Sequence, residues 1–66
     1  MTPPVHRFRE GERVQLIQPF DAVAAGTYGT ILTWFMGSSL YDVRFDGYTA
    51  PRIILDRYLA PVPPAP

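Results

Sequence analysis

The chain has 66 residues, no cysteine and a formal net charge of zero, because six arginines balance six acidic residues. This length is enough for one small domain, and the lack of cysteine rules out disulfides and thiolate metal sites. A neutral chain does not carry the basic excess that is typical of a general nucleic-acid binder.

The apolar content is high for a chain with so little interior. Hydrophobic residues make up 47% of the sequence and aromatic residues 14%, whereas a domain of this size buries only about 60% of its unfolded surface. Stability must therefore come from core packing or self-association, and some apolar surface must stay outside or meet a partner. The sequence has neither a signal-peptide pattern nor a long apolar run, so we expect a cytoplasmic protein with no membrane contact.

Three segments are expected along the chain. Residues 1–7 are predicted to form a flexible N-terminal arm, residues 8–62 the domain, and residues 63–66 a proline-rich tail. Prolines in both end segments favour extended backbone and provide no amide donors. The single histidine, His6, falls in the arm, so we expect neither a metal site nor a cofactor.

The first predicted strand is Arg13–Ile17, which follows a turn at Gly11 and ends before Pro19. Apolar and polar residues alternate along it, which is typical of a strand with one buried face. Val14 and Leu16 share one face of this strand.

The segment Gln18–Ala25 is predicted to be a loop with an apolar middle. We expect Phe20 and Val23 to fold back over one end of the domain. A single helical turn from Asp21 is an alternative, since aspartate can cap a helix.

Gly26 and Gly29 indicate a turn with positive φ and a strand start that another backbone approaches closely. The second predicted strand, Thr30–Phe35, is rich in β-branched and aromatic residues and precedes a loop at Met36–Ser39. Its register is open, because a one-residue slip or a bulge exchanges its inward and outward side chains. Trp34 therefore lies either in the core or on the surface.

Leu40–Phe45 alternates cleanly and is the third predicted strand. The dipeptide Asp46-Gly47 after it predicts a two-residue type I′ hairpin turn. That turn sets a register of facing pairs. The expected pairs are Phe45 with Tyr48, Val43 with Ala50, and Asp42 with Pro51.

Pro51 supports this register, because it falls where no backbone donor toward the neighbouring strand is needed. It also makes Tyr48–Ile54 an edge strand, since proline has no N–H for a second neighbour. The same alternation places Ile53 on the outer face beside Leu40. The side chains expected on the core-facing side are Tyr48, Ala50, Arg52 and Ile54.

Asp56–Tyr58 is short and polar, which predicts one turn of 3-10 helix, and Leu59–Val62 is the last predicted strand, with Leu59 buried. No long helix is expected. Five short strands with glycine-rich turns imply an all-β fold, a small five-stranded barrel with this 3-10 turn before the last strand.

Several short motifs together carry a family resemblance. They are Gly11-x-Arg13-Val14-x-Leu16, Gly26-x-x-Gly29-x-Ile31, Tyr41-x-Val43-x-Phe45 and Leu59. The chain resembles SH3-like barrels over roughly residues 8–62, and it is similar to KOW-type segments, to the small stromal photosystem I subunit of the PsaE type, and to the NifZ type of nitrogenase-maturation protein. The resemblance implies a fold rather than a function. The basic residues that support nucleic-acid binding by a KOW segment are not evident.

Seven residues are candidates for binding a partner: Trp34, Phe35, Met36, Leu40, Tyr48, Ile53 and Tyr58. The resemblance to SH3-like domains implies a peptide groove in which Trp34, Phe35 and Met36 meet Tyr48 or Tyr58. The alternative is that Trp34 belongs to the core, because a barrel this small relies on large side chains.

A second candidate surface combines Leu40 and Ile53 with either Leu32 or Phe35. Three contiguous apolar side chains beside an edge strand favour self-association or a protein partner. The alternative is that they are scattered surface residues, which are common in monomeric proteins.

Arg52 is expected on the core-facing side opposite Tyr41, where it stacks and pairs with a carboxylate such as Asp42 or Asp56 at the rim of the barrel. Arg44 and Arg52 are the candidates for a rim or ligand contact. The aspartates form no recognisable acid–base pair, and the serines have no histidine near them in the sequence, so no catalytic residue is predicted.

The leading hypothesis is a non-catalytic SH3-like interaction or accessory module that forms a homo-oligomer or docks on a larger protein complex. The alternative is RNA or DNA binding through Arg9, Arg13 and Arg44 with aromatic stacking. A remote alternative is an enzyme assembled by symmetry. The plasmid-borne trimethoprim-resistant dihydrofolate reductases work in this way, but their Val-Gln-Ile-Tyr segment is missing here.

Overall fold

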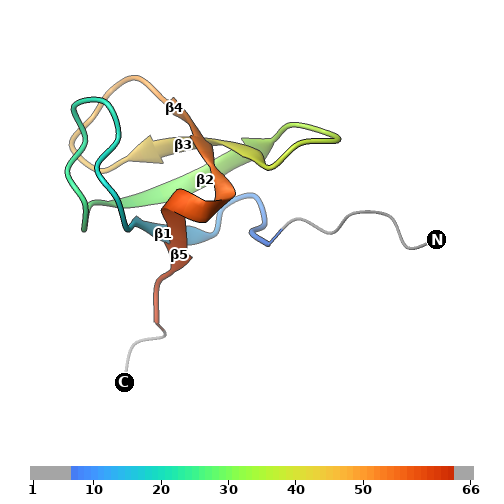
Figure 1. Ribbon diagram of the computed structural model, residues 1–66, viewed down its shortest axis with the longest axis horizontal. Helices are drawn as coiled ribbons and strands as arrows, with labels where there is room; N and C mark the ends of the chain where they lie inside the picture. Colours follow the sequence, from blue (N-terminus) through green and yellow to red (C-terminus); the bar gives the residue numbers. More distant parts are fainter. Residues whose placement is uncertain (1–6, 64–66) are drawn as a thin grey trace.

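The computed structural model describes residues 7–63, and within them the fold is all-β. Five antiparallel strands form one sheet in the order β4-β3-β2-β1-β5, and one 3-10 turn precedes the last strand, as predicted (Figure 1). Residues 1–6 of the predicted arm and residues 64–66 of the predicted tail lie outside the described residues. The elements are β1 (Arg13–Leu16), β2 (Tyr28–Trp34), β3 (Leu40–Phe45), β4 (Arg52–Leu55), η1 (Asp56–Tyr58) and β5 (Leu59–Pro61).

Strands β4 and β5 are the two edges of the sheet. The strand after the Asp-Gly turn is therefore an edge strand, as predicted, although it begins at Arg52 rather than at Tyr48. Hydrogen-bonded closure into a barrel would require pairing between β4 and β5, and the residues described here show no such pairing.

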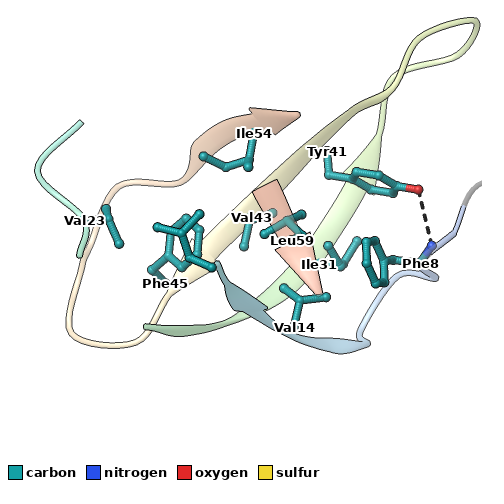
Figure 2. Packing of buried hydrophobic residues seen from close by; sticks show 10 residues of the cluster. Phe8, Val14, Val23, Ile31, Tyr41, Val43, Phe45, Ile54 and Leu59 are labelled. Carbon is teal, nitrogen blue, oxygen red and sulfur yellow. Dashed lines mark hydrogen bonds between the residues drawn. The ribbon is translucent and has the colours of Figure 1, made fainter. Parts of the chain in front are cut away.

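Alternate residues of the strands turn inward and build the core. Val14 and Leu16 of β1 are buried, and so are Tyr41, Val43 and Phe45 of β3, as the period of two predicts. Burying an aliphatic or aromatic side chain of this size contributes about 1.5–3 kcal/mol. The buried apolar residues of the described chain (Figure 2) are Phe8, Val14, Leu16, Val23, Ile31, Tyr41, Val43, Phe45, Ile54 and Leu59.

The residues just before β1 also contribute to the core, which the sequence did not predict. The Phe8 ring packs edge-on against Tyr41 with centroids 5.4 Å apart, and the Phe8 N–H donates to the Tyr41 hydroxyl at 3.3 Å (Figure 2). Arg7, which we assigned to the arm, donates to the Asp56 carboxylate and to the Leu59 carbonyl. These contacts attach Arg7 to the domain.

The loop between β1 and β2 folds back onto the core, as predicted. Val23 is buried and Phe20 packs against the core from outside. The alternative of a helical turn is wrong, because Phe20 and Val23 exchange two backbone hydrogen bonds of 3.0 and 2.9 Å across a two-residue turn. Asp21 takes a φ of 55° there, a left-handed conformation that aspartate tolerates better than most residues.

The turn at Asp46-Gly47 differs from the predicted type I′ hairpin. The Tyr48 N–H donates to the Phe45 carbonyl at 3.0 Å, so a four-residue turn does form. Gly47 has a φ of 86°, but Asp46 keeps a negative φ, whereas type I′ requires positive values at both positions. The chain therefore leaves the ladder after the turn instead of pairing at once.

The pairing of β3 with β4 is consequently shifted by two residues from the predicted register. Val43 faces Arg52 instead of Ala50. Tyr48 lies outside β4, and its hydroxyl donates to the Ala22 carbonyl at 3.0 Å, so this side chain is bonded to the loop between β1 and β2. Since side chains alternate with a period of two, the shift leaves Ile54 inward and Ile53 outward, as predicted. Ala50, which was predicted on the core-facing side, is exposed and lies outside β4.

A β-bulge in β2 fixes the register that the sequence left open. Ile31 and Thr33 pair with consecutive residues of β3, so Leu32 is the extra residue. Ile31 is buried and Leu32 faces outward. After the bulge Trp34 lies opposite the buried Tyr41 and packs against the core.

Candidate interaction surface

The outer face of β2, β3 and β4 carries a row of apolar side chains. The Phe35 N–H donates to the Leu40 carbonyl at 3.1 Å, and Leu40 in turn pairs with Leu55. Residues that face each other across antiparallel strands have Cβ atoms about 4.5–5.5 Å apart. Phe35, Leu40 and Leu55 therefore lie side by side.

Two further apolar side chains flank this row. Ile53 precedes Leu55 by two residues on the same face of β4 and is 52% exposed. Leu32 is turned outward by the bulge. We call the resulting set the outer apolar patch, and its members are Leu32, Phe35, Leu40, Ile53 and Leu55.

The structure brings together Leu40 and Ile53, which the sequence placed on one face. It adds both Leu32 and Phe35, which were alternatives, because the bulge allows both side chains to point outward. Leu55 was missed, because the predicted strand ended one residue earlier. The available signal was its position two residues after Ile53, which places both on one face of an extended strand.

Met36 extends this surface at the tip of the hairpin between β2 and β3. Its side chain is 89% exposed, and the loop is held by a hydrogen bond from the Ser38 N–H to the Phe35 carbonyl. Figure 1 shows the hairpin projecting beyond the rest of the domain. Methionine is flexible and polarisable, so it adapts to an irregular contact surface.

The predicted aromatic groove between Trp34 and Tyr48 is wrong. Trp34 pairs with Tyr41 near the start of β3, whereas Tyr48 follows the turn at the end of that strand. Strand β3 has six residues, and each residue of a strand advances by about 3.4 Å. The two side chains therefore belong to opposite ends of the sheet.

Tyr48 and Tyr58 both pack against the folded-back loop. The Tyr48 hydroxyl donates to the Ala22 carbonyl at 3.0 Å, and the Tyr58 ring packs edge-on against Phe20 with centroids 5.9 Å apart. Both tyrosines are half-buried against the core. These contacts attach the loop to the domain and set both side chains apart from the outer apolar patch.

Arg52 makes a different ion pair from the one predicted. Its Nε lies 3.3 Å from the carboxylate of Asp21, rather than pairing with Asp42 or Asp56. The Asp56 carboxylate is instead bound by the guanidinium of Arg7, because the residues before β1 reach η1. Arg52 does lie over an aromatic ring, that of Tyr48 at 5.8 Å, but it pairs with Val43 and not with Tyr41 as the predicted register required.

The other end of the outer face is polar. Arg44 is exposed and pairs with Thr30, which in turn pairs with Arg13. Arg13 donates to Asp46 with its two terminal nitrogens, at 3.0 and 2.5 Å. This hydrogen bonding lowers the pKa of the Asp46 carboxyl and raises the pKa of Arg13.

An open hollow of about 420 Å³ borders the patch beyond the end of β4. It is lined by Ser39, Leu55, Asp56 and Arg57. The Asp56 N–H donates to the Ser39 carbonyl at 2.8 Å, so η1 is tied to the start of β3. The hollow thus gives the apolar patch a polar margin on this side.

Comparison with protein-family models, with curated proteins and with solved structures found no match. Within residues 7–63 no three histidine, cysteine or acidic side chains gather closely enough to hold a metal ion. No helix of the described part has the length and apolar character that crossing a lipid bilayer requires.

Proposed function

We propose that this chain is a small protein-interaction module of SH3-like type, and that the outer apolar patch is its contact surface. One observation carries the proposal, namely that apolar side chains gather on the outer face of a sheet whose inner face already encloses the core. Phe35, Leu40 and Leu55 face one another in turn, Ile53 lies next to Leu55 on β4, and Leu32 is exposed at the bulge. A second apolar face has no role in the core of the same domain. Contiguous exposed apolar surface of this kind marks sites of protein contact.

The margins of the patch fit this role. Arg57 and Asp56 line the hollow beyond Leu55, and Arg44 is exposed at the other end of the outer face, while Asp42 lies beside Ile53 within the patch. An apolar centre with a polar margin is the usual anatomy of a protein interface. The aromatic and methionine side chains of Phe35 and Met36 belong to the residue types that are enriched in such interfaces.

Nucleic-acid binding has less support. Arg13, one of the three arginines proposed for it, is engaged by Asp46, and Arg7 and Arg52 also contact aspartates. A phosphate would have to compete with these carboxylates for the guanidinium groups. We therefore retain protein binding as the proposed function.

The test compares the wild-type chain with Phe35→Ser and with a matched control, Ile17→Ser. Both residues are exposed and apolar, at 38% and 49%, but Ile17 lies outside the patch. Light scattering measures self-association of each purified chain, and affinity capture followed by elution with the free wild-type chain measures specific partner binding. We expect Phe35→Ser to weaken the captured partner's binding about tenfold or more, as removal of an interface anchor does, and Ile17→Ser to leave it unchanged.

Two results would contradict the proposal. One is a wild-type chain that stays monomeric and retains no protein that free chain can displace. The other is an interaction that Phe35→Ser and Ile17→Ser weaken to the same extent, because the contact surface would then lie elsewhere.

A further inference from the structure

The hydrogen-bonding groups of β4 divide into two sets. The direction of each group follows from two bonds at the start of β3. The Leu40 carbonyl points toward β2, because it accepts from the Phe35 N–H, and the Ser39 carbonyl points toward β4, because it accepts from the Asp56 N–H. Because backbone groups alternate in direction along a strand, Tyr41 and Val43 also bond toward β4. Their partners in β4 are Ile54 and Arg52.

It follows that Ile53 and Leu55 point their backbone N–H groups away from β3, toward the open edge of the sheet. Among the described residues, no hydrogen bond to the N–H or carbonyl of Ile53 is found. The Leu55 carbonyl is different, because it accepts the first hydrogen bond of η1, which begins directly after β4 (Figure 1). Pro51, just before β4, offers a carbonyl and has no N–H.

The edge therefore presents a defined order of groups. Pro51 offers an acceptor, Ile53 offers a donor and an acceptor, and Leu55 offers a donor. In an antiparallel partner the same groups run in the opposite direction. When Ile53 faces Ile53 of a second copy, each Ile53 donor meets an Ile53 acceptor, and each Leu55 donor meets a Pro51 acceptor. The missing N–H of Pro51 then falls opposite the Leu55 carbonyl that η1 already uses.

We propose that β4 pairs with β4 of a second copy of this chain, around a two-fold axis at Ile53. This inference goes beyond the proposed function, because the pairing uses the edge of β4 and leaves the outer face of the sheet open to another protein. Four intermolecular hydrogen bonds form, two between the Ile53 residues and two from Leu55 N–H to the Pro51 carbonyl. Registers that place Ile53 opposite Pro51 or Leu55 give two such bonds, because the remaining group is absent or already bonded.

The side chains agree with this register. Residues that pair across the new edge lie on one face of the joined sheet, so Ile53 meets its copy and Leu55 meets Pro51 on the outer side. The two patches then become continuous. The Asp42 side chains of the two copies are three strand spacings apart, about 14 Å, which exceeds the Debye length of about 8 Å at physiological salt.

Charge does not oppose the association either. The chain has a formal net charge of zero, so two copies do not repel each other as wholes. An exposed edge strand without pairing is also a liability for any small β protein. Symmetric pairing of β4 removes one of the two edges of this sheet.

Amide hydrogen exchange followed by NMR tests the register, using the full chain at low and high concentration. In the monomer we expect Ile53 and Leu55 amides to exchange quickly, while Arg52 and Ile54 amides, bonded to β3, exchange slowly. At high concentration both Ile53 and Leu55 amides should become protected about tenfold or more. Protection of one of the two without the other would assign a different register and overturn the proposal.

Sedimentation equilibrium of Ile53→Pro and Ile53→Val tests the role of the backbone bonds. Both replacements carry three side-chain carbons, but proline removes the N–H, and in the monomer this N–H has no partner among the described residues. Wild type and Ile53→Val should reach twice the chain mass of 7.4 kDa. Ile53→Pro should weaken the dimer about thirtyfold or more, because two hydrogen bonds are lost, while circular dichroism shows an unchanged fold.

Failure of this inference can be told apart from failure of the proposed function. A wild-type chain that stays monomeric at millimolar concentration overturns the β4 dimer. If the same chain still retains a displaceable partner and loses it with Phe35→Ser, the proposed function stands without the dimer. A dimer that Ile53→Pro and Ile53→Val weaken equally also overturns the proposal, because the backbone of Ile53 would then take no part.

Discussion

At the scale of single residues, Gly29 shows how closely the strands approach. A Cβ atom on Gly29 would lie 2.9 Å from Phe45 Cδ1, 2.9 Å from Val43 Cγ1 and 3.0 Å from the Arg44 carbonyl. The sequence predicted a close approach of another backbone at this glycine. The structure shows that core side chains occupy the space as well, so the requirement for glycine comes from packing.

We expect Gly29→Ala to destabilise the domain by about 1–3 kcal/mol, the usual cost of overpacking. Urea denaturation measures this loss in the free energy of unfolding, provided that the dependence of this free energy on urea concentration is the same in both proteins. Gly37→Asn is the control, because Gly37 has open space around it and a φ of 73° that asparagine tolerates. Equal stability of Gly29→Ala and wild type would contradict the packing around β2.

The pair of Arg13 and Asp46 predicts a pH dependence. The hydrogen bond from Arg13 lowers the pKa of Asp46 below its ordinary value of 3.8. The contribution of this ion pair to stability is therefore fully present above the ordinary pKa of aspartate, and it is lost as the pH falls through the lowered pKa of Asp46 in the folded protein. In Arg13→Gln the pKa of Asp46 should rise, whereas Arg57→Gln should leave it nearly unchanged.

An NMR titration of the Asp46 carboxyl carbon gives this pKa in each variant. An identical titration in wild type and Arg13→Gln would rule out the ion pair in solution. The sequence assigned Asp46 to the turn, and that is correct, but the ion pair links residues 33 positions apart. Arg13 can be identified as the partner of Asp46 only when the order of the strands in the sheet is known.

At the scale of elements, the bulge in β2 decides which side chains reach each face. Alternation alone could not choose between Ile31 and Leu32 as the buried residue, because either register is consistent with a strand of β-branched and aromatic residues. The bulge places Ile31 and Trp34 on the inner side and leaves Leu32 outside. The outer apolar patch depends on this one extra residue.

Truncation of the two neighbours tests the bulge. Ile31→Ala should cost about 2–5 kcal/mol, as for other buried isoleucines, and Leu32→Ala should cost about 0.5 kcal/mol or less, as for an outward side chain. Thermal or urea unfolding of both variants under one buffer condition measures the difference. Equal losses would mean that the strand populates both registers.

The turn after β3 shows where a strong local signal is overruled. Asp46-Gly47 predicts a type I′ hairpin, yet Asp46 keeps a negative φ, the Tyr48 side chain bonds the Ala22 carbonyl, and the register with β4 is shifted by two residues. The contact partner lies 26 residues away in the sequence, so no local rule contains it. Because the shift is even, the prediction of Ile54 inside and Ile53 outside was still correct.

At the scale of the whole molecule, the pattern of apolar residues was sufficient for the strand count, the 3-10 turn and most of the core. Strand alternation and turn residues are local properties, and both are readable from one sequence. The burial of Phe8 could not be predicted from the sequence, because a single apolar residue among polar ones shows no strand or helix periodicity. Its burial depends on Tyr41 from β3 reaching the start of the domain.

The candidate site was predictable in part for the same reason. Leu40 and Ile53 follow from alternation, but the separation of Trp34 from Tyr48 follows from topology, since the two residues flank opposite ends of β3. The outer apolar patch is therefore the surface that we propose for binding, and Trp34 and Tyr48 do not share one groove. The central claim of the proposed function is that these side chains are covered when another protein binds the outer face.

The most direct measurement of that claim is methyl NMR of the full chain with a soluble paramagnetic probe, at dilution and under associating conditions. The methyl signals of Leu40, Ile53 and Leu55 should broaden with the probe in dilute protein and become shielded when a protein partner binds the outer face, whereas pairing of β4 with a second copy should shield Ile53 and Leu55 and leave Leu40 accessible. Ile17 should remain accessible in both states. Shielding of Ile17 with continued exposure of Leu40, Ile53 and Leu55 would contradict the account.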